Sequence, residues 1–136
     1  MNAKAERRLL QIAVALACIV PLTMGGLSVI RGVAVIKGAP ALADLDSHFR
    51  YLSGIFLAVG IAFATCVPAI EQKGARFRLL GAMVVAGGLA RLLSWAETGA
   101  PGVGHRFGLA MELGVVPLLM AWQWRVARRS RFATMA

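Results

Sequence analysis

Four long apolar segments occupy most of this chain and constrain its fold more than any other feature. They cover residues 9–30, 48–70, 78–96 and 105–126. A helix rises about 1.5 Å per residue, so each segment is long enough for a hydrocarbon core of about 30 Å. Lipid cannot satisfy an open backbone, and no alternating pattern of about ten residues indicates a barrel. The sequence therefore predicts an all-α fold, a four-transmembrane-helix bundle that forms one domain over residues 1–136.

The composition supports a membrane protein and argues against a nucleic-acid partner. Hydrophobic residues fill 59% of the positions and charged residues only 15%. A soluble domain of this length could not hide so much apolar surface, whereas lipid solvates it. The 15 basic residues gather at the ends of the apolar segments and do not interleave with aromatic residues. This distribution is typical of membrane topology and not of a phosphate-binding surface.

The basic residues also predict an orientation. Most of them lie on one side, in the N-terminal arm, the loop after the second segment and the C-terminal tail: Lys4, Arg7, Arg8, Lys73, Arg76, Arg78, Arg125, Arg128, Arg129 and Arg131. The positive-inside rule places this side in the cytoplasm. The first segment exceeds a signal-peptide core of about 7 to 15 residues, so we expect it to be a permanent helix. We expect a multi-pass protein of the bacterial inner membrane with both termini cytoplasmic.

Three charged residues, Arg50, Arg91 and Glu112, interrupt segments that are otherwise apolar. Charge at membrane depth is costly, and such residues are normally paired, turned inward and connected with function. Small residues share their helical faces, which predicts close helix packing there: Gly54, Gly87, Gly88 and Gly108. We expect an intramembrane polar network in which Arg91 pairs with Glu112 and Arg50 lies close by.

Further polar residues gather toward the outer ends of the segments, and they predict the rim of a pocket on the periplasmic side: Asp44, Asp46, His48, Glu97, His105 and Arg106. A pocket of this kind would suit an anionic head group or a carboxylate. The alternatives are an ion pair that only fixes helix register, which we favour, and a proton relay. Residues 31–47 should lie along the interface as a short helix or flap, with Asp44 and Asp46 capping the second helix.

Cofactor motifs are weak. His48 and His105 are the only histidines, and a haem held between them is an alternative to the expected absence of any cofactor. We expect no metal site. Cys18 and Cys66 form no Cys-x-x-Cys pair and are expected to be packing residues. No nucleophile elbow, phosphate loop or helical zinc motif is present, so the sequence leans away from an enzyme and leaves any catalytic residue unknown.

Two stretches resemble a known family. Residues 47–55 (SHFRYLSGI) carry an HFR-[YF]-L-x-G pattern, and residues 87–94 (GGLARLLS) follow in the third segment. Together with Glu112 and Pro117, they resemble a family of small bacterial four-helix inner-membrane proteins of unknown function, near the DoxX-like proteins. The resemblance covers about residues 47–125. It implies an all-helical membrane protein whose characteristic polar residues are Arg50, Arg91 and Glu112, and it implies no activity.

Three classes of function remain open. The first is a non-catalytic accessory or interaction subunit, with the bilayer, other membrane subunits or a second copy of the chain as partners; exposed Ala82, Ala86 and Ala90 would suit such contacts. The second is a membrane protein that binds a lipid, a quinone or a small anion in the outer pocket, and it includes enzymes. The third is a small exporter. Four-helix exporters rely on a glutamate in the first helix, and residues 9–30 contain no acid.

Overall fold

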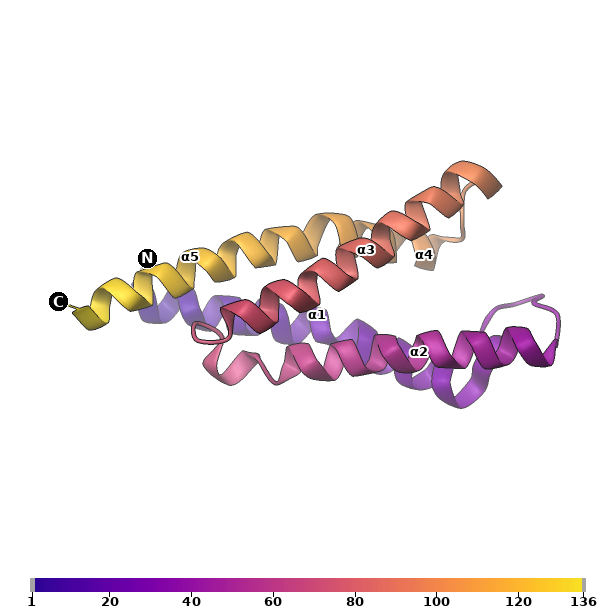
Figure 1. Cartoon of the computed structure of the whole chain (residues 1–136), viewed down its shortest axis with the longest axis horizontal. Helices are drawn as coiled ribbons and strands as arrows, with labels where there is room; N and C mark the ends of the chain where they lie inside the picture. The colour runs from indigo at the N-terminus through magenta and orange to yellow at the C-terminus, as the bar shows by residue number, and fades with distance from the viewer. Residues whose placement is uncertain (1, 136) are drawn as a thin grey trace. The chain divides into compact units, whose positions relative to one another are not determined.

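The computed structural model describes residues 2–135, which form helices and no strand (Figure 1). In chain order the elements are α1 Ala3–Arg31, η1 Gly32–Val35, α2 Ala43–Ala64, η2 Val67–Ala69, α3 Gly74–Thr98, α4 Val103–Ala110, η3 Met111–Val115 and α5 Val116–Met135. The elements η1 and η2 are 3₁₀ turns, and η3 is a π-helical turn that joins α4 to α5.

Four helical stretches are long and apolar enough to cross a membrane. They are Ala3–Val35, Ala43–Ala69, Gly74–Thr98 and Val103–Arg131. This finding confirms the all-α class and the four spanning-length helices, and it indicates a small membrane protein. The expected bounds were too short at several ends. The second helix begins at Ala43 and not near residue 48. Its first turn carries Asp44 and Asp46, so this turn is not part of the apolar segment seen in the sequence.

The described chain packs as two units, and each is described by itself. One unit comprises residues 2–11 together with 68–135, and the other comprises Ile12–Val67. The expectation of a single domain stays a prediction.

In the unit Ile12–Val67, the main part of α1 packs against α2. A Cβ added at Gly60 would lie 2.8 Å from the Pro21 Cβ, so the two helices touch where α1 carries its internal proline. A Cβ at Gly25 would lie 3.0 Å from the Leu57 backbone nitrogen. Small residues thus let the two backbones approach closely, which is the usual device in membrane helices.

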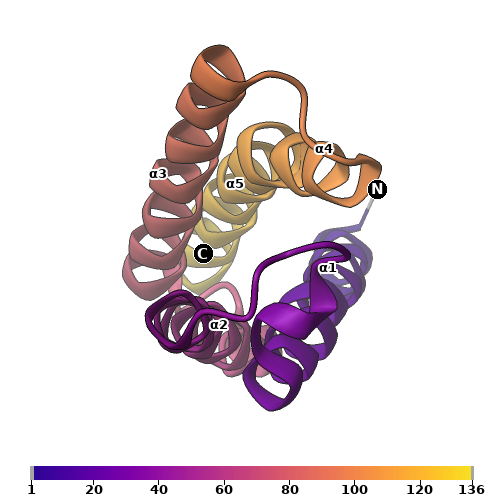
Figure 2. The same cartoon turned by 90° about the vertical axis from the view of Figure 1, so that its right-hand side faces the viewer.

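In the other unit, α3 packs along α5 and η3 (Figure 2). A Cβ added at Gly88 would lie 2.9 Å from the Glu112 Cβ, so only glycine fits against the π-helical turn. That turn has a local cause. Pro117 has no N–H to return to the preceding turn, and the Val116 N–H bonds instead to the Met111 carbonyl, five residues back. The proline thus accompanies a widened turn that carries Glu112.

Candidate functional site

A paired guanidinium and carboxylate form the centre of the candidate site. Arg91 Nε lies 3.0 Å from Glu112 Oε2, and Arg91 Nη2 lies 3.0 Å from Glu112 Oε1. The Glu112 side chain is only 11% exposed, and that of Arg91 is 33% exposed. Gly108 lies beside the pair, since a Cβ added at Gly108 would lie 3.8 Å from the Arg91 Cζ. Two parallel charge-assisted hydrogen bonds fix the guanidinium plane as well as neutralise its charge.

His105 completes this group from α4. Its Nδ1 lies 2.8 Å from Arg91 Nη1. A guanidinium can only donate hydrogen bonds, so Nδ1 must be the acceptor. The imidazole is therefore neutral and carries its proton on Nε2. The contact fixes the tautomer of His105 without a carboxylate.

A pocket opens next to these residues. It has a volume of about 350 Å³ and is lined by Arg91, Ser94, Pro101 and His105. The helix α3 supplies the first two residues, and the loop and start of α4 supply the others. Glu112 lies behind Arg91 in the π-helical turn, and such turns are frequent at functional sites. The geometry marks this end of α3 as the candidate binding site.

Arg50 has a different role in the unit Ile12–Val67. Its Nε lies 2.7 Å from Asp46 Oδ2, and its Nη1 donates to the carbonyls of Val29 and Ile30 at 2.6 and 2.9 Å. These carbonyls belong to the last turn of α1, where helix geometry leaves carbonyl groups without partners. Arg50 therefore closes the C-terminal end of α1. Its expected proximity to Arg91 and Glu112 stays a prediction.

Asp46 does not cap its own helix, as the sequence had suggested. The N-cap of α2 is Leu42 and makes no side-chain hydrogen bond, and Asp46 lies within the first turn. Its Oδ1 accepts the Val33 N–H at 2.7 Å, so it holds the 3₁₀ turn η1. Gly32 is the first residue of that turn and has a φ of 60°, and an added Cβ would collide with the Asp46 carboxylate. The Asp46 carboxylate thus binds the connection between α1 and α2 and not the N-terminal end of α2.

The other expected rim and packing residues make fewer contacts. Four of the expected rim residues are exposed and have no ion-pair partner within the described part of the chain: Asp44, His48, Glu97 and Arg106. A Cβ added at Gly54 or Gly87 meets nothing within 4 Å, so a packing role for these two glycines stays a prediction. Residues 2–135 contain no group of three or more His, Cys, Asp or Glu that could hold a metal ion. Cys18 and Cys66 are buried thiols, and the Cys66 Sγ donates to the Ala62 carbonyl at 3.4 Å.

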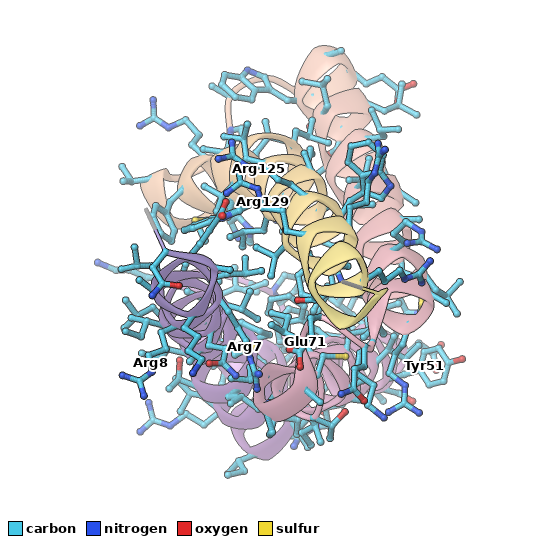
Figure 3. All side chains as sticks on the ribbon, turned by 90° about the vertical axis from the view of Figure 1, so that its left-hand side faces the viewer. Arg7, Arg8, Tyr51, Glu71, Arg125 and Arg129 are labelled. Atoms are coloured by element: carbon cyan, nitrogen blue, oxygen red, sulfur yellow. The ribbon has the colours of Figure 1, made fainter. Side chains whose placement is uncertain are left out.

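A second polar cluster was missed by the sequence analysis. Glu6, which is only 1% exposed, pairs with Arg125 at 3.0 Å and also with Arg129. Figure 3 shows the two arginines at successive turns of α5, toward the C-terminal end of the chain. The sequence predicts that the first helix begins near residue 9, after the basic N-terminal arm, whereas the structure places Glu6 in the first turn of α1. The available signal was that it is the only acid in that arm.

The same cluster extends to the connection before α3. Arg7 Nε approaches Glu71 Oε2 to 3.0 Å as an ion contact without hydrogen-bond alignment, and Arg7 Nη2 donates to the Pro68 carbonyl at 3.1 Å (Figure 3). Gln123, which is fully buried on α5, donates to the Ile70 carbonyl at 2.9 Å. Side chains from α1 and α5 thus hold the backbone of η2 and of the connection that follows it.

These features define a small all-helical membrane protein with four helices of spanning length. The chain belongs to the family defined by a domain of unknown function, DUF4345, which matches residues 9–123. Arg50, Arg91, His105 and Glu112 lie inside the matched range, whereas Glu6 and the arginines that bind it lie outside. Comparison with curated proteins gives no match, and comparison with solved structures gives none. The expected relation to DoxX-like proteins stays a prediction.

Proposed function

We propose that this protein is a non-catalytic accessory or interaction subunit of a larger assembly in the bacterial inner membrane. The supporting observation is a row of small exposed residues on α3, made of Ala82, Ala86 and Ala90. These residues recur at helical spacing and lie on a different face from Gly81, which packs against Met120 of α5, and from Gly88, which packs against η3. In lipid, faces of small residues are where another helix approaches closely.

The state of the charged residues agrees with this proposal. Arg91 and Glu112 neutralise each other, and Arg50 is used by Asp46 and by helix-end carbonyls. Pairs of this kind fix helix register and need no ligand to be stable. The carboxylate of Glu6 is likewise taken by two arginines, which leaves the exporter as the weakest of the three classes.

The proposed orientation has both termini in the cytoplasm, because the basic arm, the loop near Lys73 and the tail share one side. Single cysteines at Ala100 and at Gln72, in a chain without Cys18 and Cys66, would be labelled from outside with a membrane-impermeant maleimide. Labelling at residue 100 and protection at residue 72 are expected. The reverse pattern would overturn the orientation.

The accessory role is tested by native mass spectrometry after gentle extraction from the native membrane. The unaltered chain should travel with a defined larger species, either other subunits or further copies of itself. Ala86→Leu should remove it from that species while leaving the isolated chain folded. Ala110→Leu, at a site on α4 that is also exposed, is the matched control and should keep the assembly. A chain that is monomeric in every sample would contradict the proposal.

A second candidate function is the binding of a lipid, a quinone or a small anion. The observation that favours it is the pocket of about 350 Å³ beside Arg91, Ser94 and His105. In the proposed orientation this pocket opens on the periplasmic side. The same extracted sample tests this function, because a tightly held small molecule would appear as added mass on the chain. Ser94→Ala should lower the fraction of the chain that carries this added mass.

A further inference from the structure

We propose that the pocket beside Arg91 binds the uncharged, carbonyl-bearing head group of a membrane-soluble compound, with a short-chain quinone as the reference ligand. This inference rests on the second candidate function and names its ligand class. It follows from three properties of the lining residues: the hydrogen bonds they can still make, their net charge, and the apolar surface around them.

The free hydrogen-bonding groups of the pocket include three donors. Arg91 Nη1 carries two N–H groups, of which one is directed at His105 Nδ1. Because that contact makes Nδ1 an acceptor, the remaining polar atom of the imidazole is the donor Nε2–H. The Ser94 hydroxyl has no hydrogen-bond partner within residues 2–135 and can donate as well. A ligand that fits these groups must therefore accept hydrogen bonds.

The charge of the site favours an uncharged acceptor over an anion. Glu112 takes two of the Arg91 nitrogens at 3.0 Å, so the guanidinium is already neutralised. The tautomer that the Arg91 contact requires leaves His105 neutral, and Ser94 and Pro101 carry no charge. The nearby ionisable groups Glu97 and Arg106 are opposite in sign and exposed. An anion would lose its hydration without gaining an unpaired cation, whereas a carbonyl oxygen needs only donors.

The surroundings of the pocket favour a ligand that arrives from lipid. Pro101 lines the pocket itself, and large apolar side chains within two residues of the lining residues in the sequence are exposed: Leu92, Leu93, Val103 and Phe107. In a membrane such side chains contact lipid tails. The volume is at the small end of ligand pockets, which span about 300–1,000 Å³. It suits a single ring, while an attached apolar tail would stay in the bilayer.

The site is also held in place before any ligand binds. The bidentate contact fixes the plane of Arg91, and Glu112 is itself fixed by the π-helical turn against Gly88. A preformed set of donors binds more tightly because less side-chain freedom is lost. Ser94 and His105 are exposed and bear on no buried core, so they can be changed without unfolding the chain.

The test is a fluorescence titration of the full chain in lipid nanodiscs with decyl-benzoquinone, which quenches nearby tryptophans. Trp122→Phe and Trp124→Phe leave Trp95 alone among the three tryptophans, next to Ser94. Saturable quenching is expected. Ser94→Ala and His105→Phe should each raise the apparent Kd about threefold to tenfold, which corresponds to the loss of one hydrogen bond. Ser53→Ala and His48→Phe change the same residue types in the other unit and should leave the apparent Kd unchanged.

The other outcomes separate the claims. The chain could instead bind a short-chain anionic phospholipid or inorganic phosphate saturably, with an affinity that Ser94→Ala lowers. That result would overturn the uncharged ligand class but keep the binding function of the pocket. Linear quenching that is equal in all variants, with no binding of either anion, would overturn both. Native mass spectrometry of the chain extracted gently from its native membrane reports the accessory role independently, since that role depends on Ala86 and not on Ser94.

Discussion

Arg50 and Arg91 are both arginines at the margin of an apolar helix, but they are used in opposite ways. Arg50 donates to the backbone carbonyls of Val29 and Ile30 and to a carboxylate one turn away on its own helix. Arg91 donates only to side chains, those of Glu112 and His105 from the following helical stretch. The first arrangement completes a helix end. The second leaves a neutral, donor-rich surface beside a pocket.

The comparison explains why an intramembrane charge does not by itself identify a site. A helix end has carbonyls that need donors wherever it lies, and an arginine that meets this need is occupied by the backbone. A bidentate pair with a carboxylate uses two of the three guanidinium nitrogens and leaves the third for another contact, which Arg91 makes with His105. What an arginine could do for a ligand therefore depends on whether its partners are backbone or side-chain atoms.

The largest effect is expected when the side-chain pair is broken from one side. Glu112→Ala leaves the half-buried Arg91 guanidinium without its counter-ion, and we expect a loss of about 3 kcal/mol in the free energy of unfolding. The unfolding midpoint in mixed micelles with increasing SDS measures it. Glu97→Ala, an exposed acid on α3 with no ion-pair partner in the described chain, should change the midpoint little. An equal loss in both variants would mean that the pair is not special.

The next effect separates the two arginines directly. Replacing both partners, Arg91→Met with Glu112→Leu, should recover most of the stability, because no buried charge remains. The analogous change, Arg50→Met with Asp46→Leu, should not recover. It leaves the carbonyls of Val29 and Ile30 and the Val33 N–H without partners, at about 1–3 kcal/mol for each group that water or lipid head groups cannot reach.

Double-mutant cycles on the two pairs provide the readout for this difference. A large coupling energy is expected for Arg91 and Glu112, and a small one for Arg50 and Asp46. If the Arg50 and Asp46 double variant were as stable as the unaltered chain, the carbonyl contacts would contribute nothing, and the distinction between the two arginines would fail.

A smaller effect tests how the Arg50 region is built. Gly32→Ala places a Cβ at a φ of 60° and against the Asp46 carboxylate, so we expect a loss of about 2 kcal/mol or more. Gly38→Ala has a similar φ of 81° but meets nothing within 4 Å, and should lose only about 1 kcal/mol. The difference between the two variants isolates the contact with Asp46. Equal losses would show that backbone strain alone matters.

The fold was largely predictable, because long apolar segments in lipid have few alternatives to helices. The Arg91–Glu112 pair was also expected from their place on glycine-lined helical faces, and the structure brings these two side chains together with His105. The roles of Arg50 and Asp46 were not. They depend on where the end of α1 and the turn η1 lie in space, and residue spacing carries no information about a contact with a backbone carbonyl 21 residues away.

The cluster around Glu6 was missed for a related reason. Hydropathy placed the start of the first helix after the basic arm, whereas the helix begins at Ala3 and carries Glu6 inward. Counting Arg125 and Arg129 as markers of orientation hid their role as partners of a buried carboxylate. A single acid within a strongly basic segment is the feature that could have predicted it.

The smallest effect on stability belongs to the serines, and it completes the comparison. Ser53 is buried and donates to the Phe49 carbonyl at 2.7 Å, whereas Ser94 is exposed in the pocket without a partner in the described chain. Ser53→Ala should therefore cost about 0.5–1 kcal/mol, and Ser94→Ala less than about 0.5 kcal/mol in the same SDS unfolding measurement. On quinone affinity the order should reverse, because only Ser94 faces the pocket. If Ser94→Ala lowered stability more than Ser53→Ala, its hydroxyl would be part of the fold, and the pocket would lose one of its three donors.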